Sequence, residues 1–304
     1  MGDTWRKQLE AGRTLIIDGG TGTELRRRGM ALSGATWSAL ASLARYELLR
    51  TIHSDYIDAG ADVITTNTFA TTRFVLEAAG HCDDFTLVNA RAVAAAREAR
   101  DRSGRDVAIA GSVSCLPPRF DVHAYPDESI ERAAYLELAE TLAEAGVDLL
   151  ALEMLQETRH APLACEAARA VGLPVWLGVS CRLGAGGAPV GFDFPLVPLT
   201  ETLETLLAFA PAAVNVMHSP VAAIEPGLRE VRARWPGPLG AYPEIGDGTP
   251  HTPHSVSPDS LAAQAFGWIA NGAQIIGGCC GAAPEHIRAL AELPRAVRPA
   301  TISD

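Results

Sequence analysis

The sequence contains no uninterrupted apolar run of the length needed to cross a membrane. Its first residues lack the apolar core of an export signal, and Arg6 stands where a myristoylation signal needs Ser or Thr. Basic residues are also in deficit, with 25 Lys and Arg against 36 Asp and Glu and a formal net charge of -11. A nucleic-acid or anionic-membrane partner needs a basic patch, so we expect neither and predict a cytoplasmic protein.

Neither disulfides nor domain linkers are indicated. Six cysteines without an export signal suggest free thiols, because the cytosol keeps thiols reduced. A chain of 304 residues that is 48% hydrophobic buries an ample core for one large domain or two small ones. We see no linker or low-complexity tail, and therefore predict one domain over residues 1–304. No heptad pattern fixes the oligomeric state, so a homo-oligomer stays open.

Short apolar runs alternate with longer helical patterns, which is typical of repeated βα units around a parallel sheet. At Gly60, Gly146 and Gly272 a helix ends on a glycine suited to a left-handed C-cap, and a strand begins soon afterwards. Eight strands in this length favour a single (β/α)8 TIM barrel, although an open doubly wound α/β sheet is also compatible. The predicted strands span residues 14–18, 62–67, 107–112, 148–153, 174–181, 212–216, 238–242 and 274–278.

The remaining segments divide into helices and loops. Residues 46–59, 83–102, 129–145, 158–171 and 258–271 have helical apolar periods with caps or first-turn acids. Loops rich in Gly and Pro are predicted over residues 116–127, 183–198 and 243–257. All three follow strands, so in a barrel they lie at the C-terminal mouth, where active sites are built.

Residues 277–281 have the sequence Gly-Gly-Cys-Cys-Gly and follow the last predicted strand. Adjacent side chains on a strand point to opposite faces, so two neighbouring cysteines can face one target only where the strand has ended. The flanking glycines allow the backbone to curl there. Cys279 and Cys280 then suit a soft metal such as zinc. Two inert buried thiols or a strained vicinal disulfide are the alternatives.

Polar residues follow several predicted strands and would face one pocket in a barrel. Asp18 and Glu153 suit a cationic group such as the ammonium of an amino acid, although acids at strand ends also cap helices. The glycine-rich segment after Asp18 lacks the Lys of a phosphate-binding P-loop. The predicted substrate-binding residues are Asp18, Gly19, Thr66, Asn67, Glu153 and Asn215.

Five segments occur together in one order, namely residues 18–25 (DGGTGTEL), 65–69 (TTNTF), 148–153 (DLLALE), 242–243 (YP) and 277–281 (GGCCG). With them the chain resembles the homocysteine S-methyltransferase family, which includes S-methylmethionine-dependent and betaine-dependent enzymes and the homocysteine barrel of cobalamin-dependent methionine synthase. The resemblance covers nearly the whole sequence. It implies a zinc-dependent barrel in which three cysteine thiolates hold the metal and the homocysteine thiol takes the fourth position.

The resemblance also implies roles for particular residues. Cys279 and Cys280 would be zinc ligands and catalytic, and Asp18 and Glu153 would fix the homocysteine ammonium group. The expected small-molecule partners are a thiol acceptor and a methyl donor. S-methylmethionine, S-adenosylmethionine and betaine all carry a methyl group on a positive centre, so the sequence does not select among them. Transfer to homocysteine would give methionine.

The chain departs from the family pattern at the third zinc cysteine. That cysteine belongs in an Asn-Cys pair at the end of the sixth strand, where Asn215 is here followed by Val216. Cys181 or His218 is the candidate replacement, although such residues are more often ordinary buried thiols or loop histidines. Cys115 looks farther away, and His251 and His254 lie in a loop that is more simply solvated.

Two other interpretations stay open. The pocket could bind metal weakly or not at all and serve another thiol, a selenol or another methyl donor. Alternatively, the chain is a non-catalytic, amino-acid-binding barrel, because a fold does not fix a function.

Overall fold

The computed structural model describes residues 4–32, 34, 36–246 and 256–295. Eight parallel strands lie in the order β1-β10-β9-β8-β5-β4-β3-β2, and a parallel bridge between Ile17 and Val63 joins the first strand to the last in this order. The predicted (β/α)8 barrel is therefore confirmed. The strands are β1 (Leu15–Ile16), β2 (Val63–Thr65), β3 (Ala108–Ser114), β4 (Leu149–Leu155), β5 (Val175–Val179), β8 (Ala213–Pro220), β9 (Leu239–Glu244) and β10 (Ile275–Ile276).

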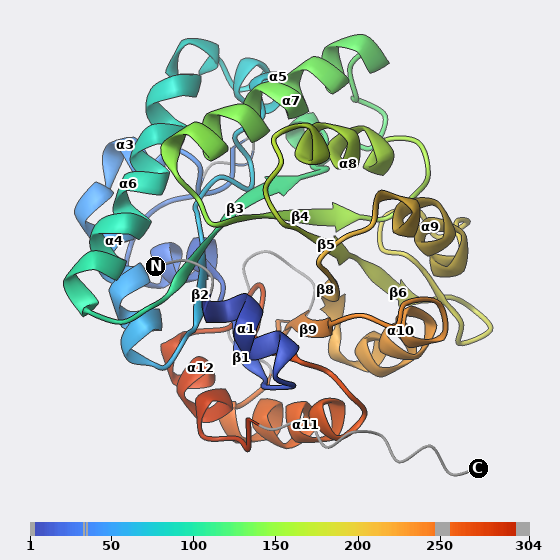
Figure 1. The fold of residues 1–304 in the computed structure, drawn as a ribbon. Coiled ribbons are helices and arrows are strands. Elements are labelled where there is room, and N and C mark those ends of the chain that lie inside the picture. Colours follow the sequence, from blue (N-terminus) through green and yellow to red (C-terminus); the bar gives the residue numbers. More distant parts are fainter. Residues whose placement is uncertain (1–3, 33, 35, 247–255, 296–304) are drawn as a thin grey trace.

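Helices surround these strands (Figure 1). The five predicted helices are present within three residues of their predicted ends. None of the helices in the described part of the chain is both long and apolar enough to span a bilayer. The helices are α1 (Thr4–Glu10), α2 (Thr21–Arg27), α3 (Ala41–Ala44), α4 (Tyr46–Asp58), α5 (Arg73–Ala78), α6 (Phe85–Ser103), α7 (Glu128–Ala145), α8 (Ala161–Ala170), α9 (Leu199–Leu206), α10 (Val221–Arg234), α11 (Pro258–Ala270) and α12 (Pro284–Ala291).

The joints before β2, β4 and β10 show why the sequence pattern located strands well. Gly60, Gly146 and Gly272 have φ values of 111°, 87° and 94°, the left-handed conformation that glycine adopts without strain. Asp62 and Asp148, two residues after the first two of these glycines, accept hydrogen bonds from the N–H groups of Ile16 and Ile109 at 2.9 and 2.8 Å. The first two joints thus end a helix and also tie the start of a strand to its neighbour.

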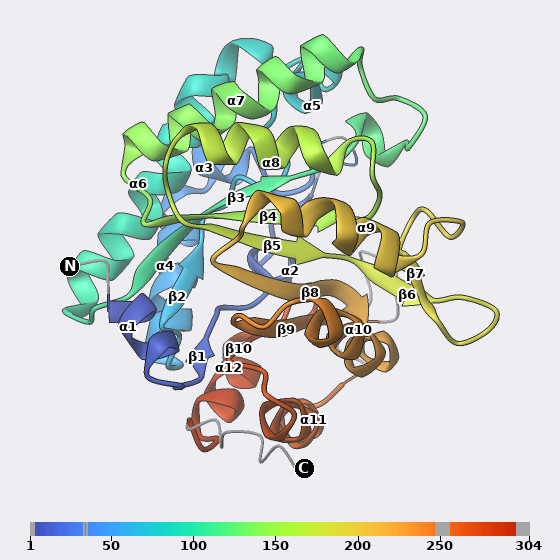
Figure 2. The same cartoon turned by 45° about the vertical axis from the view of Figure 1, so that its right-hand side comes forward.

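One predicted segment differs in the structure. The predicted fifth strand ran to Cys181 and was followed by a loop over residues 183–198, but β5 ends at Val179. Cys181 instead begins a two-stranded antiparallel hairpin, β6 (Cys181–Leu183) with β7 (Pro189–Gly191). Ser180 separates the two strands, and its N–H bonds Leu155 O at 3.1 Å. Figure 2 shows the hairpin projecting beside the ends of α9 and α10.

Two layers of apolar side chains hold the barrel. Inside it, residues such as Ile17, Ala151 and Met217 form one core, while a larger core lies between the strands and the helices. At the N-terminal end of the barrel, Trp5 of α1 packs edge-on against Trp176, with ring centroids 5.4 Å apart. Because this end is plugged by α1, the open end is the one where the strands finish.

His53 of α4 gives a prediction about acid stability. Neither ring nitrogen of this fully buried side chain has a hydrogen-bond partner among the described residues, and burial lowers its pKa to about 4. The unfolded chain, with a histidine pKa near ~6.5, takes up a proton as the pH falls towards 4 while the folded chain does not. Stability should therefore fall over this window by up to about 3 kcal/mol.

A His53→Leu variant lacks this titration and the penalty of burying an unpaired ring. We expect its melting temperature to exceed that of the wild type at pH 5, with a smaller difference at pH 8. His123→Leu, at an exposed histidine, is the control and should follow the wild type. The same loss of stability between pH 8 and pH 5 in wild type and His53→Leu would contradict the prediction.

Candidate metal and substrate site

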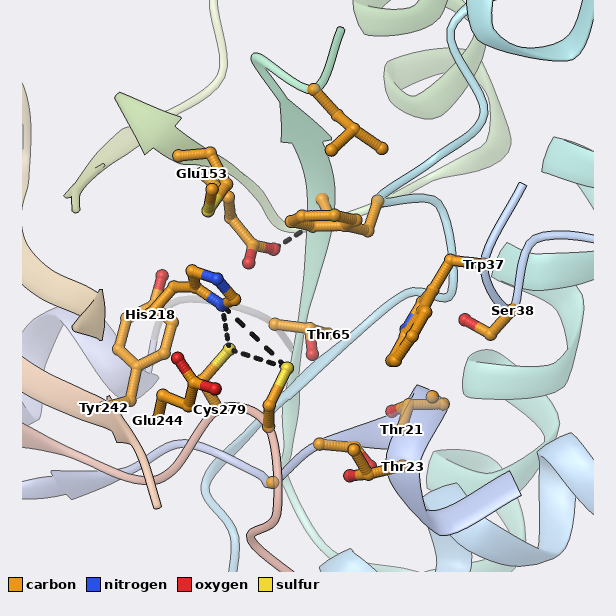
Figure 3. Close-up of a pocket in the computed structure, with 18 of the residues that line it drawn as sticks. Thr21, Thr23, Trp37, Ser38, Thr65, Glu153, His218, Tyr242, Glu244 and Cys279 are labelled. Carbon is orange, nitrogen blue, oxygen red and sulfur yellow. Dashed lines mark hydrogen bonds between the residues drawn. The ribbon is translucent and has the colours of Figure 1, made fainter. Parts of the chain in front are cut away.

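A cavity of about 250 Å³ lies at the open end of the barrel. Its wall is built from residues at the ends of several strands and from the loops that follow them (Figure 3). Ile17 and Asp18 come from the end of β1, Glu153 from β4, His218 from β8 and Tyr242 from β9. Cys279 and Cys280 follow β10. Residues from distant parts of the sequence therefore converge on one space.

Three possible metal ligands face one another in this cavity. His218 Nδ1 lies 3.5 Å from Cys279 Sγ and 3.9 Å from Cys280 Sγ, and the two sulfurs are 4.0 Å apart (Figure 3). Bonds of ~2.3 Å to sulfur and ~2.0 Å to nitrogen in a tetrahedron place such ligand atoms about 3.6–3.8 Å apart. The three atoms thus fit a zinc ion that keeps a fourth position for another ligand.

The pKa values of these three residues favour metal binding. The hydrogen bond from Cys279 and the nearby His218 hold the pKa of Cys280 well below that of an ordinary thiol. The pKa of Cys279 is raised by its bond to Cys280 and by burial. Burial lowers the pKa of His218, but Cys280, Glu244 and Asp193 together raise it to about 9. These shifts favour a Cys280 thiolate beside a protonated His218, and a divalent cation could take the place of that proton.

The loop that carries the two cysteines is fixed against the end of β9 and lies close to the segment that follows β1. Cys279 N–H bonds Pro243 O at 2.8 Å, and Ile245 N–H bonds Cys280 O at 3.0 Å. Gly281 adopts a φ of 88°, which lets the chain turn back after Cys280. Gly20 must also be glycine, since a Cβ there would lie 2.6 Å from Cys279 O.

Asp18 and Glu153 are buried carboxylates that share the cavity with these ligands. Asp18 accepts hydrogen bonds from Thr65 N and Oγ1 at 2.8 and 2.9 Å, and Glu153 accepts one from Ser112 Oγ at 2.5 Å. Burial raises the pKa of Asp18 to about 8 and that of Glu153 to about 7, because these hydrogen bonds do not replace the lost hydration. Both groups would ionise more readily beside a positive group of a ligand.

The other predicted substrate-binding residues divide into two groups. Gly19, Thr66 and Asn67 line or border the cavity wall. The amide of Asn67 is held by Ser38, accepting from Oγ at 2.7 Å and donating to the backbone oxygen at 2.8 Å. Asn215 does not line the cavity, because its side chain is buried in the barrel interior, where neither amide atom has a protein partner among the described residues.

The two replacement ligands proposed from sequence are separated by the structure. Cys181 Sγ lies on the helix-facing side of the barrel, where a Cβ added to Gly227 of α10 would be 3.3 Å from it and 3.1 Å from Val216 Cγ1. Cys181 is therefore not beside Cys279 and Cys280, and the prediction that it could complete their site is wrong. Cys115 is likewise buried in the outer core. Val216 also faces outward.

Strand alternation alone would have placed His218 outward as well. Asn215 and Met217 point into the barrel and Val216 points out, so the next residue in regular alternation would also point out. His218 has a φ of 43°, however, and the pairing of β8 with β9 shifts register between Met217 and Pro220. This strained bulge turns the imidazole to the cavity. His251 and His254 lie outside the described residues.

Sequence reasoning missed several residues of the cavity. Glu244 directly follows the Tyr242-Pro243 pair. Asp193 lies just after the β6–β7 hairpin, in a segment predicted to be a loop. With Asp18 and Glu153 they make four carboxylates, whereas no Lys or Arg is among the described residues that line the cavity. Aromatic residues complete the wall, including Trp37, Phe69, Phe120, Phe192 and Tyr242. The cavity is thus suited to a positively charged ligand.

Comparisons with known proteins give the family and the fold. A family model described as homocysteine S-methyltransferase matches residues 15–293. The chain is 28% identical to homocysteine S-methyltransferase 4 of Zea mays, over 97% of this chain and 92% of the relative. It is 25% identical to a selenocysteine methyltransferase of Astragalus bisulcatus, over 92% of each. The crystal structure of the metallated form of the homocysteine methyltransferase MmuM from Escherichia coli matches with a TM-score of 0.75 and 25% identity. The match covers 94% of this chain and 98% of the MmuM chain.

Proposed function

Since the chain belongs to the homocysteine S-methyltransferase family, we propose that it transfers a methyl group from a small sulfonium donor to the thiol of homocysteine and so forms methionine. The observation that carries this proposal is the convergence of Cys279, Cys280 and His218 at zinc-ligand distances in a cavity that also holds two buried carboxylates. We further propose that residues 1–304 form one barrel domain, as the family match over residues 15–293 supports.

Cys279, Cys280 and His218 would hold zinc. Bound there, it would supply the positive charge that keeps an incoming thiol, with a free pKa near ~8.5, in the thiolate form at neutral pH. Asp18 and Glu153 would receive the ammonium group of homocysteine, and their ionisation is favoured once that charge is bound. The acceptor would thus be held at both ends.

Methyl transfer itself needs no acid or base at the methyl carbon. The thiolate sulfur provides the electron pair for the new S–C bond, and the donor sulfur keeps the electron pair of the bond that breaks and leaves as a neutral thioether. The work of the protein is to align the two sulfurs and the methyl carbon and to exclude water. Aromatic side chains such as Trp37 and Phe192 form part of the wall that would do so.

The charge of the cavity favours one kind of donor. With Asp18 and Glu153 paired with the ammonium group of homocysteine, Asp193 and Glu244 remain in a cavity with no lysine or arginine among its described lining residues, and they would attract a donor of net positive charge. S-methylmethionine and S-adenosylmethionine carry such a charge, whereas betaine is zwitterionic. With homocysteine as acceptor we expect turnover with a sulfonium donor to exceed turnover with betaine at least ~10-fold, measured as methionine formed. Equal rates would contradict this part of the proposal.

The acceptor is tested in the same assay. Some relatives are selenocysteine methyltransferases, so selenocysteine is supplied in parallel with homocysteine. A higher kcat/KM for homocysteine supports the proposal, and a higher value for selenocysteine would replace it with the selenol as substrate. Binding of homocysteine without turnover by any donor would indicate an amino-acid-binding barrel.

The identity of the third metal ligand is tested by two single variants. We expect His218→Ala, purified after expression with zinc, to retain less than ~10% of the zinc found in the wild type, because a two-cysteine site lacks the three protein ligands that zinc needs. Cys181→Ala is the matched control and should retain zinc, since that thiol lies behind β8. Zinc lost from Cys181→Ala but kept by His218→Ala would reverse the assignment. Elemental analysis is the measurement.

A further inference from the structure

His218 is the least regular part of the candidate metal site. Its backbone has a φ of 43°, which a side chain with a Cβ adopts only under strain, so neighbouring contacts must hold it there. Cys279 and Cys280 approach the imidazole at Nδ1. Further contacts come from the β6–β7 hairpin and the segment that follows it.

The first of these contacts is made through the backbone next to His218. Ser219 Oγ donates a hydrogen bond to Met217 O at 2.7 Å and accepts one from Cys181 N, the first residue of β6, at 2.9 Å. The first of these bonds spans His218 in the sequence, and the second reaches the hairpin. They tie the bulge of β8 to the base of the hairpin.

The second contact is made on the ring itself. Phe192 follows β7, and its ring meets the His218 ring edge to face, with centroids 5.1 Å apart and an interplanar angle of 62°. The backbone N–H of Phe192 bonds Ser180 O at 3.2 Å, which fixes the phenyl group to the end of β5. An aromatic edge at this distance limits rotation of the imidazole.

The third contact fixes the backbone next to Phe192, through hydrogen bonds to Asp193. Buried Gln156, just beyond β4, accepts a hydrogen bond from Asp193 N at 2.5 Å and donates one to Asp193 Oδ2 at 3.0 Å. Gly191 packs closely against the backbone of Gln156, since a Cβ at this position would lie 2.5 Å from Gln156 O. The two-point bond from Gln156 therefore sets where Phe192 stands.

We propose that Gln156 and Phe192 are positioning residues for the metal ligand His218, holding its imidazole in the orientation in which Nδ1 faces Cys279 and Cys280. This inference rests on the proposed function, because it presumes that these three residues bind zinc. It adds a role for the hairpin, which pairs with no strand of the barrel. Groups that orient a metal-binding histidine typically change metal affinity ~10- to 100-fold when they are removed.

The test measures metal affinity without any substrate. Phe192→Leu and Gln156→Leu are prepared alongside the wild type, and zinc dissociation constants are determined by competition with a chromogenic chelator. We expect each variant to bind zinc about 10- to 100-fold more weakly than the wild type. The visible spectrum of the cobalt-substituted protein should shift in both, because it reports the geometry around the metal. Melting temperatures of the metal-free proteins establish that the variants are folded.

Two further variants serve as controls. Phe192→Tyr keeps the aromatic edge and should restore wild-type affinity to within ~3-fold, which a general disturbance of the loop would not do. Leu196→Ala changes a side chain of the same loop that is 94% exposed and should leave affinity and spectrum unchanged. If Gln156→Leu does not fold, the comparison of zinc affinity between Phe192→Leu and Phe192→Tyr still tests the inference.

The outcomes separate this inference from the proposed function. Weaker zinc binding in Phe192→Leu, with rescue in Phe192→Tyr, supports it. Zinc affinities and cobalt spectra equal to those of the wild type in both leucine variants would overturn the inference while leaving the metal site intact. A wild-type protein that binds no zinc would overturn the proposed function and this inference together.

Discussion

Cys279→Ser and Cys280→Ser are each expected to abolish zinc retention and to reduce methyl transfer to homocysteine by at least ~1000-fold. A serine hydroxyl stays protonated where a thiolate is needed, so each substitution removes one of three converging ligands. Zinc per chain and the initial rate of methionine formation are the measurements. Because zinc binding needs both sulfurs, we expect the same loss of activity in each single variant.

Cys82→Ser is the matched control for these two variants. Cys82 is also a partly exposed free thiol, but it lies next to Arg73 and not in the cavity. It should keep the zinc content and rate of the wild type. A Cys279/Cys280 double serine variant with full activity would refute metal-assisted transfer by this chain.

Glu153→Gln is expected to raise the KM for homocysteine by about 100-fold and, at the same time, to stabilise the metal-free protein at pH 8. The glutamine keeps the oxygen that accepts from Ser112 Oγ but cannot provide the negative charge for an ammonium group. Losing a buried, charge-assisted contact costs roughly 2–3 kcal/mol of binding free energy, which is the stated change in KM. Initial rates over a range of homocysteine concentrations measure it.

The stability effect follows from the pKa of Glu153. Burial raises it from 4.5 to about 7 in the folded protein, so the folded chain binds the proton more tightly than the unfolded chain. The contribution of Glu153 to the stability of the wild type should therefore fall by about 3 kcal/mol as the pH rises from 4.5 towards 7, opposite in sign to the contribution of His53 over nearly the same range. Glutamine has no such titration. The melting temperature of Glu153→Gln should thus exceed that of the wild type at pH 8 and approach it at pH 5.

The control for this prediction is Glu140→Gln, which replaces an exposed carboxylate on α7. Its melting temperature should follow that of the wild type at both pH values. If Glu153→Gln were no more stable than the wild type at pH 8, Glu153 would not be a destabilising buried charge, and its assignment as an ammonium-binding group would lose its physical basis.

Much of the barrel could be predicted because its local signals agree with its packing. All eight strands begin one residue after their predicted starts, since the apolar run marks the boundary and, before β2, β4 and β10, a left-handed glycine marks it as well. The β6–β7 hairpin was missed because its turn is rich in glycine and was taken for loop. Helix α10 was missed because Pro226 and Gly227 interrupt its pattern.

The candidate site was less predictable where backbone geometry departs from regular periods. Cys279 and Cys280 could be found because flanking glycines and a strand end together explain adjacent thiols. The choice between His218 and Cys181 could not be made from sequence, because it depends on a bulge that turns one side chain inward. The predicted substrate-binding role of Asn215 also depends on geometry that the sequence does not give. Its side chain points into the barrel but lies too deep to line the cavity.

The adjacency of β1 and β10 has a consequence for how the protein is made. Gly20 N–H bonds Ala282 O and Gly278 N–H bonds Asp18 O, so the first turn of the barrel mouth is completed by residues that are translated long after it. A nascent chain still attached to the ribosome at Ile276 has neither thiol of the pair. Zinc bound by the proposed ligands would therefore load only after Cys280 has been translated, and a message truncated before Cys279 would yield a polypeptide without this pair of thiols.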